Sequence, residues 1–595
     1  MTKTDKRNRF VWLSLLSIQV LLLAITVARL YMTRQAVLGM DECISCQAIT
    51  MIQHEAGLWA LVWLLLALAS WSFRPLRWLC VAVVWSLIMI LVADVMTLQQ
   101  FSLRLFLTDI FKFGQQPVFI IEYLQNLLGW FWIPLAAIAI IGLPWLMLFT
   151  LHRHLSTPPA RLGLLAMCIL SALLYTLPDK TAHALPWTYL NLLEANWPSG
   201  TDEPYSQAYI DGLLAEPPAG LATEICEAGL ATGGDVIIVA IESLSWYHSS
   251  LVLPVSMEAT PQLDALAREN SWWDHFYSNG FTTDHGLIAM LAGQLPVPAV
   301  NRYRSMNVFN GYEAGAASLT QRLARDGYYS AFLTSGHLAF LGKGEWLHSL
   351  GFDHVEGHDQ AEYDDAERFE FSAVGDELLY RRVVNWLKNE RPGDQPVVAF
   401  VETVTTHPPF VDPDTRQVSE AAAFRYADRS LAGFIRELEA MDYFRDGLLI
   451  ITSDQRALTP VRPAEMEAFG QSAGARLPLI MLGDRLPLRG RQSTAAQMSD
   501  LPFSLDYYLS DEACHLPGQG NLFTAQAPEC IYQADGNQRS IINAFCADQT
   551  ASIRMDGDQT AVIKGQLPDE QRRIRELNYL RARLGIRDVD IHIVL

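Results

Sequence analysis

The segment "LLIITSDQRAL" (Leu448–Leu458) decides how the second half of this chain folds. Its apolar, largely β-branched run stops at Ser453 and is followed by Asp454 and Gln455. Apolar runs of this length are typical of strands buried on both faces, as in parallel sheets. A carboxylate directly after such a strand indicates a metal or catalytic position in an α/β enzyme. In a divalent-metal site the expected companion of Asp454 is histidine, and glutamine stands there instead.

Four similar runs lie after residue 232, and helical stretches separate them. They are "DVIIVAI" (235–241), "YYSAFLT" (328–334), "PVVAFVET" (396–403) and "LPLIML" (477–482). Strands that alternate with helices predict a mostly parallel sheet covered by helices on both faces. Because sites in such sheets form outside the carboxyl ends of the strands, the residues that follow each strand are the candidates for a functional site.

The first 178 residues have a different character. The chain of 595 residues is 50% hydrophobic, and nearly all of its excess hydrophobicity lies before residue 180. Five segments are long and apolar enough to cross about 30 Å of hydrocarbon. They lie near 10–30, 57–73, 75–97, 126–151 and 161–178. We therefore predict a five-helix transmembrane bundle over 1–178, a linker over 179–232 rich in proline, glycine and alanine, and an external α/β domain over 233–595.

Basic residues set the expected orientation. They precede the first segment and lie in the loops after the second and fourth: Lys3, Lys6, Arg7, Arg9, Arg74, Arg77, Arg153 and Arg161. The positive-inside rule places the N-terminus in the cytoplasm, and five crossings then place the large domain outside. We expect a multi-pass protein of the bacterial inner (cytoplasmic) membrane with this domain in the periplasm or outside the cell. The net charge of -20 argues against nucleic acid as a partner.

Two further features of the external parts have alternative interpretations. The segment 101–114 has apolar residues at helical spacing, and it either lies flat in the outer interface or packs on the bundle as a loop helix. Cys43 and Cys46 form a CxxC pattern, for which a local disulfide is the plain interpretation and a redox or metal role the alternative. The sequence does not pair the four other external cysteines.

Two carboxylates follow strands of the predicted sheet. Glu242 comes directly after "VIIVAI", as Asp454 comes after "LLIITS". Each carboxylate can be explained by a salt bridge or helix cap, or by metal binding. The meeting of two carboxylates at one edge of the sheet favours metal binding. Between them, Thr282 and Thr283 precede an apolar helical run. A threonine there is either a helix N-cap or a nucleophile activated by a divalent cation beside the helix N-terminus.

His407 lies just past the strand predicted over 396–403, before two prolines that fix an exposed loop. An isolated histidine is often structural. In this position it can also bind a phosphate or protonate a leaving alkoxide.

Together these motifs resemble a known group. A five-span membrane segment precedes "VIIVAIESLS", "GFTTDHG", "GKGEWLHSLGFDHV", "VETVTTHPPF" and "IITSDQ" in that order. The chain resembles the lipoteichoic acid synthase and phosphoglycerol transferase group of the alkaline phosphatase/sulfatase superfamily. The resemblance implies a nucleophilic Thr282, with Thr283 at the serine position of the G-x-T-S-D pattern. It also implies metal ligands at Glu242, Thr282 and Asp454, with substrate binding by His407, Lys343 and Trp346, and less strongly by His337.

The sequence departs from the group at two positions. Gln455 replaces the histidine that follows the metal aspartate, and Arg456 replaces the next glycine. An amide oxygen is a neutral, hard ligand, so we expect Gln455 to join the metal ligands and the ion to be Mn²⁺ or Mg²⁺. Arg456 adds a cation that either binds a substrate phosphate or competes with the metal.

The resemblance implies transfer of a phosphoglycerol group from an anionic phospholipid to a glycan or glycolipid acceptor through a phosphothreonine intermediate. Two alternatives remain open. One is a phosphoethanolamine transferase acting on lipid A or a glycan. The other is a catalytically impaired family member with a binding role, for which Gln455 is the main argument. A sulfatase is disfavoured, because "TTDHG" lacks the C/S-x-P-x-R motif.

Overall fold

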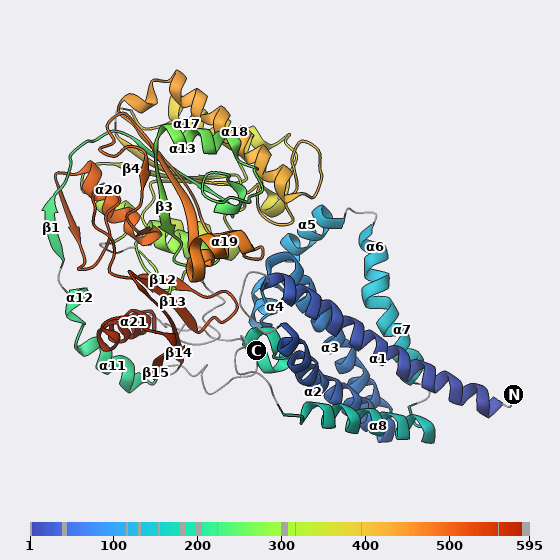
Figure 1. Ribbon diagram of the computed structural model, residues 1–595. Coiled ribbons are helices and arrows are strands. Elements are labelled where there is room, and N and C mark those ends of the chain that lie inside the picture. Colours follow the sequence, from blue (N-terminus) through green and yellow to red (C-terminus); the bar gives the residue numbers. More distant parts are fainter. Residues whose placement is uncertain are drawn as a thin grey trace. The chain divides into compact units, whose positions relative to one another are not determined.

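The computed structural model of the chain divides into two compact units (Figure 1). The first comprises Met1–Ile110, Leu127–Trp197 and Thr459–Val461, and the second comprises Phe111–Asn126, Pro198–Leu458 and Arg462–Leu595. The structure describes all residues except 1–2, 38–43, 115–116, 129–131, 153–154, 179–185, 197–204, 223, 299–307, 314, 316, 394, 557 and 586–595.

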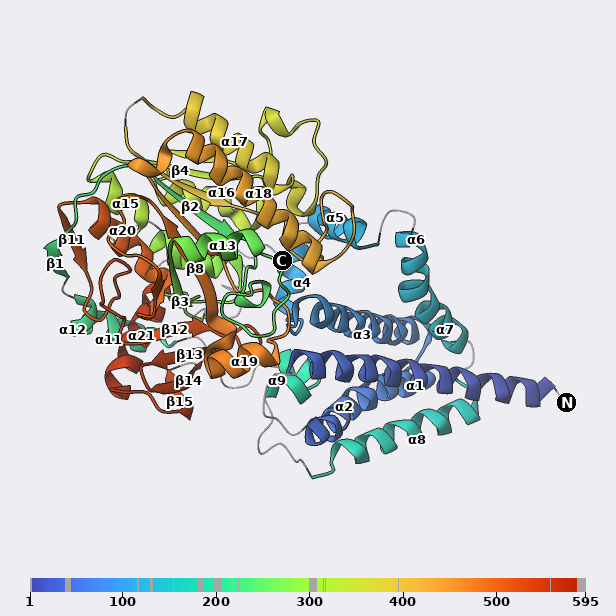
Figure 2. The same cartoon turned by 45° about the horizontal axis from the view of Figure 1, so that its top comes forward.

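The first unit carries the membrane helices. Four helices are long and apolar enough to span a bilayer: α1 (Lys3–Ala36), α2 (Ile44–Trp71), α3 (Arg74–Phe101) and α8 (Pro158–Tyr175), visible side by side in Figure 2. A fifth span exists only as a bent pair, Pro117–Leu127 with Trp132–Leu146, whose parts meet at 104°. Four predicted spans are thus single helices, and the predicted span near 126–151 corresponds to this broken pair. The chain is a membrane protein.

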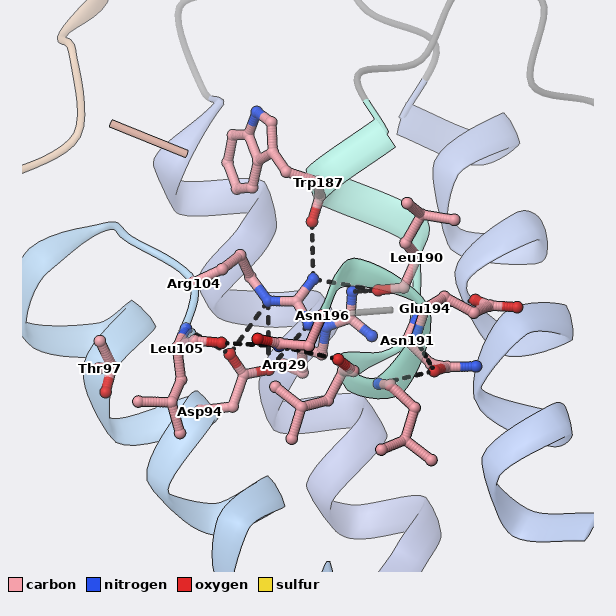
Figure 3. Close-up of polar contacts among 12 residues, drawn as sticks. Arg29, Asp94, Thr97, Arg104, Leu105, Trp187, Leu190, Asn191, Glu194 and Asn196 are labelled. Carbon is pink, nitrogen blue, oxygen red and sulfur yellow. Dashed lines mark hydrogen bonds and ion pairs between the residues drawn. The ribbon is translucent and has the colours of Figure 1, made fainter. Parts of the chain in front are cut away.

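Buried charges tie the segment that follows α8 to the bundle (Figure 3). Arg104 pairs with Asp94 of α3 and donates hydrogen bonds to the carbonyl oxygens of Trp187 (2.7 Å) and Leu190 (3.0 Å). Arg29 of α1 pairs with a glutamate of α2 and also donates to the Leu190 carbonyl. A charge inside a membrane protein is tolerated when it is paired in this way. The cluster therefore fixes α9 (Pro186–Tyr189) and α10 (Leu192–Asn196) against the ends of the spans.

The second unit is built on a nine-stranded sheet. Its main path runs β10-β3-β8-β7-β2-β6-β4-β5, and the central strands are parallel. The strands are β2 (Val236–Ile241), β3 (Ser271–Tyr277), β4 (Tyr329–Thr334), β5 (His354–Glu356), β6 (Val397–Glu402), β7 (Leu448–Ser453), β8 (Arg476–Leu482), β9 (Arg491–Gln492) and β10 (Ala496–Gln497). The mostly parallel sheet is confirmed, and the antiparallel partners are β8 with β7 and β3.

Both faces of the sheet are covered. Alternate residues of β2 belong to two different cores, because side chains of a strand point to opposite faces. One core includes helices α13 (Pro261–Glu269), α17 (Asp376–Asn389) and α18 (Glu420–Ala440), which lie together on one side of the sheet in Figure 1. This double coverage explains why the strands read as continuous apolar runs rather than alternating ones.

Smaller elements complete the unit. A four-stranded antiparallel sheet, β12 (Ile531–Ala534), β13 (Ile541–Cys546), β14 (Gln549–Asp556) and β15 (Gln559–Gly565), precedes α21 (Glu570–Gly585). Part of the predicted linker is ordered, since β1 (Ile225–Ala228) pairs with β11 (Glu512–His515). Disulfides join Cys226 to Cys514 and Cys530 to Cys546, a pairing that the sequence left open. Cys43 lies outside the described residues, so the CxxC disulfide stays a prediction.

Candidate active site

The two strand-end carboxylates meet. β2 and β7 are adjacent and parallel, with Ile241 opposite Ser453, so Glu242 and Asp454 leave the sheet side by side. The backbone N–H of Ser243, which has φ 57°, donates to Asp454 Oδ1 (2.9 Å). Glu242 and Asp454 are buried, at 5% and 1% exposure. The prediction that these two residues converge is confirmed.

Burial makes this pair electrostatically unfavourable. It is the main cause that raises the pKa of Glu242 and of Asp454, and the charge of Glu242 raises the pKa of Asp454 further. Hydrogen bonds from Ser243 and Gln455 act in the opposite direction on Glu242. Among the described residues, no lysine or arginine forms an ion pair with either carboxylate. Two buried carboxylates so placed require a proton or a cation between them.

The remaining oxygens of the site fit a hard cation. Asp454 Oδ2 and Gln455 Oε1 are buried and have no hydrogen-bond partner in the described part of the chain. The Gln455 amide nitrogen donates to Glu242 Oε1 (3.2 Å), which leaves the amide oxygen as the atom available to an ion. Carboxylate and amide oxygens suit Mg²⁺ or Mn²⁺. No group of three or more His, Cys, Asp or Glu able to hold a metal occurs in the described ranges, so this mixed oxygen set is the candidate.

Two threonine hydroxyls lie at the start of α14 (Thr283–Leu287). Thr282 is its N-cap residue, in extended conformation, and its side chain makes no capping hydrogen bond. Thr283 Oγ1 donates to Glu242 Oε2 (3.3 Å) and also interacts with Asp454. The motif therefore singles out Thr282, whereas the hydrogen bonds hold Thr283 against the carboxylates. No sequence pattern predicts that contact of Thr283.

Gly286 lets α14 lie directly against the end of β7. A Cβ at this position would meet the Asp454 carbonyl oxygen at 1.9 Å, a distance that backbone atoms cannot accommodate without moving. We expect Gly286→Ala to destabilise the protein by about 1–3 kcal/mol, as overpacking does elsewhere. Gly474→Ala is the control, because nothing lies within 4 Å of its Cβ position. Thermal unfolding of both variants checks this, and equal melting temperatures would contradict it.

His407 lies in the loop after β6. Its Nδ1 is 2.6 Å from the Pro408 carbonyl oxygen, and the ring of Phe371 meets it edge-on at 4.8 Å. Burial lowers the pKa of His407 to about 4, so the ring is neutral at pH 7. Donation from Nδ1–H to Pro408 makes Nε2 the acceptor nitrogen. His407 thus suits accepting a hydrogen bond from a substrate hydroxyl better than protonating a leaving group.

The other predicted substrate residues have different surroundings. Lys343, the first residue of α16 (Lys343–Ser349), pairs with Glu402 at the end of β6 (2.5 Å). Trp346 is buried, stacks on Phe309 and donates its indole N–H to a backbone carbonyl. Lys343 is therefore engaged by Glu402, whose charge adds to the rise in the pKa of Glu242, and Trp346 has a packing role.

Arg456 and His337 are also engaged. Arg456 is buried and makes two hydrogen bonds to Glu465 (3.0 and 2.6 Å), so its charge is matched within the domain. His337 stacks on His358 with 4.0 Å between ring centroids. Glu402 is the carboxylate that sequence reasoning missed, although its place at the end of an apolar strand is the same signal that identified Glu242 and Asp454.

Comparison with known proteins agrees with this geometry. Residues 234–503 match the family model described as Sulfatase. Phosphoglycerol transferase I of Escherichia coli O139:H28 is 26% identical over 218 residues, which cover 34% of this chain and 28% of that protein. The Salmonella arizonae protein of the same name is 26% identical over 216 residues, 33% of this chain and 28% of that protein. The alignment thus spans little more than a quarter of these relatives.

Comparison with solved structures identifies the fold of the α/β domain. A Vibrio parahaemolyticus protein in the alkaline phosphatase superfamily has a TM-score of 0.51 at 20% identity, over 64% of this chain and 97% of that chain. The lipoteichoic acid synthase LtaP of Listeria monocytogenes has a TM-score of 0.43 at 16% identity, over 64% and 96%. These findings agree with the resemblance inferred from the motifs: the chain is a membrane protein whose residues 234–503 match the Sulfatase family model and whose α/β domain has the fold of the Vibrio protein.

Proposed function

We propose that this protein is a metal-dependent phosphotransferase that moves a phosphoglycerol group from a membrane phospholipid to a glycan or glycolipid acceptor. The observation that supports this proposal most directly is the buried pair Glu242 and Asp454. Asp454 Oδ2 has no hydrogen-bond partner among the described residues, and the Thr283 hydroxyl, next to the N-cap residue Thr282, contacts Glu242. The curated relatives named phosphoglycerol transferase I support the choice of transferred group. The membrane helices support a donor that is itself a lipid, such as phosphatidylglycerol.

The divalent ion, Mn²⁺ or Mg²⁺, would be held by Glu242, Thr282, Asp454 and the amide oxygen of Gln455. When bound, it supplies Lewis-acid polarisation of the phosphate and lowers the pKa of the nucleophilic hydroxyl. Gln455 fills the position of the group's histidine with an oxygen donor, so on this proposal the substitution changes metal preference rather than abolishing the site.

The proposed reaction consists of two displacements at phosphorus. In the first, the Thr282 oxygen attacks phosphorus, the bond to diacylglycerol breaks, and diacylglycerol gains the proton that threonine loses. In the second, the acceptor hydroxyl oxygen displaces Thr282, which regains a proton. The N–H groups of α14 and the Lys343 ammonium face the negative charge of the phosphoryl group. His407, neutral and with Nε2 as acceptor, orients the incoming hydroxyl.

The proposal is tested with the full-length protein in nanodiscs that contain headgroup-labelled phosphatidylglycerol or phosphatidylethanolamine. We expect diacylglycerol release with phosphatidylglycerol and Mn²⁺ or Mg²⁺, loss of release with a chelator, and recovery when metal is restored. Release from phosphatidylethanolamine alone would instead support the phosphoethanolamine transferase. Absence of release with either lipid and any divalent metal would overturn the transferase and favour a binding role.

A further inference from the structure

Helix α5 (Pro117–Leu128) comes from the membrane half of the sequence, yet Phe111–Asn126 groups with the second unit. Its docked face contacts a short loop, residues 369–372, that we call the rim loop. Glu122 accepts hydrogen bonds from the backbone N–H (3.2 Å) and hydroxyl (2.9 Å) of Ser372. The Phe119 ring packs against Phe340 and Phe371, with centroids 5.2 and 5.8 Å away.

The rim loop connects this helix to the candidate active site. Phe371 meets the His407 ring edge-on at 4.8 Å. Phe371 and Ser372 have φ of 56° and 55°, a region that residues other than glycine adopt only at a cost. Consecutive residues in this region persist when surrounding contacts stabilise them, and such strain is frequent at functional sites. Glu122 stabilises this conformation by accepting hydrogen bonds from the backbone N–H and the hydroxyl of Ser372.

A second contact strengthens the docking. Glu370, also in the rim loop, is 4% exposed, and Asn126 of α5 is close enough to act against the rise in its pKa. Residues 119, 122 and 126 are three or four apart, so they share one side of the helix. α5 thus faces the rim loop with an aromatic ring, a carboxylate and an amide.

The other side of α5 is apolar and uncovered. Ile120 and Ile121 are 43% and 49% exposed. Only three residues separate Leu128 from Trp132, where the next apolar helix begins, so the two helix ends are within about 14 Å of each other. α5 is thus connected closely to a membrane segment, and it has an apolar face opposite its docked face. A lipid surface is the environment expected to bury such a face.

We propose that α5 lies in the outer lipid interface with Ile120 and Ile121 among the acyl chains, while Glu122 and Phe119 hold the rim loop beside His407. The donor phospholipid would then enter the site along α5, with its headgroup toward His407. The presentation of donor lipid rests on the proposed function, whereas the lipid contact of α5 does not.

Lipid contact is measured with an environment-sensitive nitrobenzoxadiazole label. Ile120→Cys is labelled in full-length protein in which Cys80 and Cys168, the free cysteines of the described residues, are replaced by alanine together with Cys43 and Cys46. Ile563→Cys is the matched control, because Ile563 is an equally exposed isoleucine (43%) of the same unit, distant from α5 in sequence. In nanodiscs we expect a blue-shifted emission, quenched by doxyl lipids, at position 120 and neither effect at 563. Identical behaviour at both positions would overturn the interfacial placement.

Positioning is measured with Glu122→Ala. The variant should lose at least about tenfold in release of diacylglycerol from nanodisc lipid, while cleavage of a water-soluble phosphoglycerol ester falls less, because only lipid presentation depends on α5. Glu122→Gln, which retains an acceptor oxygen, should recover part of the loss. Glu439→Ala, an exposed glutamate of α18, is the control. Unchanged release by Glu122→Ala would overturn the positioning role. If wild type releases nothing but the label at position 120 is quenched, the proposed function fails and the placement of α5 stands.

The docking should also depend on pH. Burial raises the pKa of Glu370 to about 7. Asn126, Glu122 and Arg416 also act on it, and Tyr123 of α5 faces its charge. A carboxyl with a raised pKa favours the docked state below its ordinary value, and this contribution is lost as pH rises from about 4.5 through 7. Hydrogen exchange of the Ser372 amide, corrected for intrinsic rate, should therefore accelerate between pH 6 and pH 8. Glu370→Gln should remove the change, and a pH effect that survives in this variant would assign it elsewhere.

Discussion

Thr282→Ala is expected to lower the rate of diacylglycerol release by at least about 10³-fold, because it removes the nucleophile on which both displacements depend. Thr283→Ala should cost less, about 10- to 30-fold, since its hydroxyl only orders Glu242 and Asp454. Steady-state assays in nanodiscs under saturating metal measure both variants. Thr282→Ser keeps a hydroxyl and should retain measurable activity.

The two variants also test the assignment between adjacent threonines. If Thr283→Ala abolishes release and Thr282→Ala does not, the nucleophile is the hydroxyl that contacts Glu242. If neither variant affects release, the threonine mechanism fails altogether. Equal melting temperatures for the two variants and wild type show that lost activity is not lost folding.

Asp454→Asn should abolish activity and also change stability in a way that reveals the metal. In wild type, an ion that binds only the folded state stabilises it by about 2.7 kcal/mol at a concentration 100 times its Kd. The asparagine variant should lose this metal-dependent gain. Without metal it should be at least as stable as wild type, because the variant removes one of two adjacent buried carboxylates.

Thermal unfolding with and without Mn²⁺ or Mg²⁺ measures these effects. Gln455→His is the companion variant, and its imidazole should shift the preference from Mg²⁺ toward Mn²⁺ or Zn²⁺. If Asp454→Asn and wild type gain equal stability from the metal, the ion binds elsewhere. If Gln455→His leaves the metal preference unchanged, Gln455 is not a ligand.

The strand pattern in the sequence was sufficient to place Glu242 and Asp454. Continuous apolar runs indicate strands that are covered on both faces. Neighbouring parallel strands bring their carboxyl ends together, whatever lies between them in the sequence. The rule that residues at the carboxyl ends of apolar strands are site candidates applies equally to Glu402, the last residue of β6.

Other features depend on tertiary contacts, which local sequence patterns do not predict. The predicted span near 126–151 is apolar enough in composition, but in the structure it belongs to a bent pair of helices. The motif predicts a substrate contact for Trp346, and the charge of Arg456 predicts contact with a phosphate or competition with the metal. In the structure, Trp346 stacks on Phe309 and Arg456 pairs with Glu465. The contact of Glu122 with Ser372 joins residues 250 apart in sequence, beyond the reach of any periodicity.

The most direct test of the account is a single-turnover reaction with phosphatidylglycerol labelled in its glycerol headgroup, quenched in acid and analysed by mass spectrometry. In the absence of acceptor, the account predicts one equivalent of diacylglycerol and a glycerol phosphate bound to the peptide that contains Thr282, with fragmentation placing it on that residue. Diacylglycerol formed without any labelled peptide at the earliest times, or a label on a residue outside α14 and its N-cap, would contradict it.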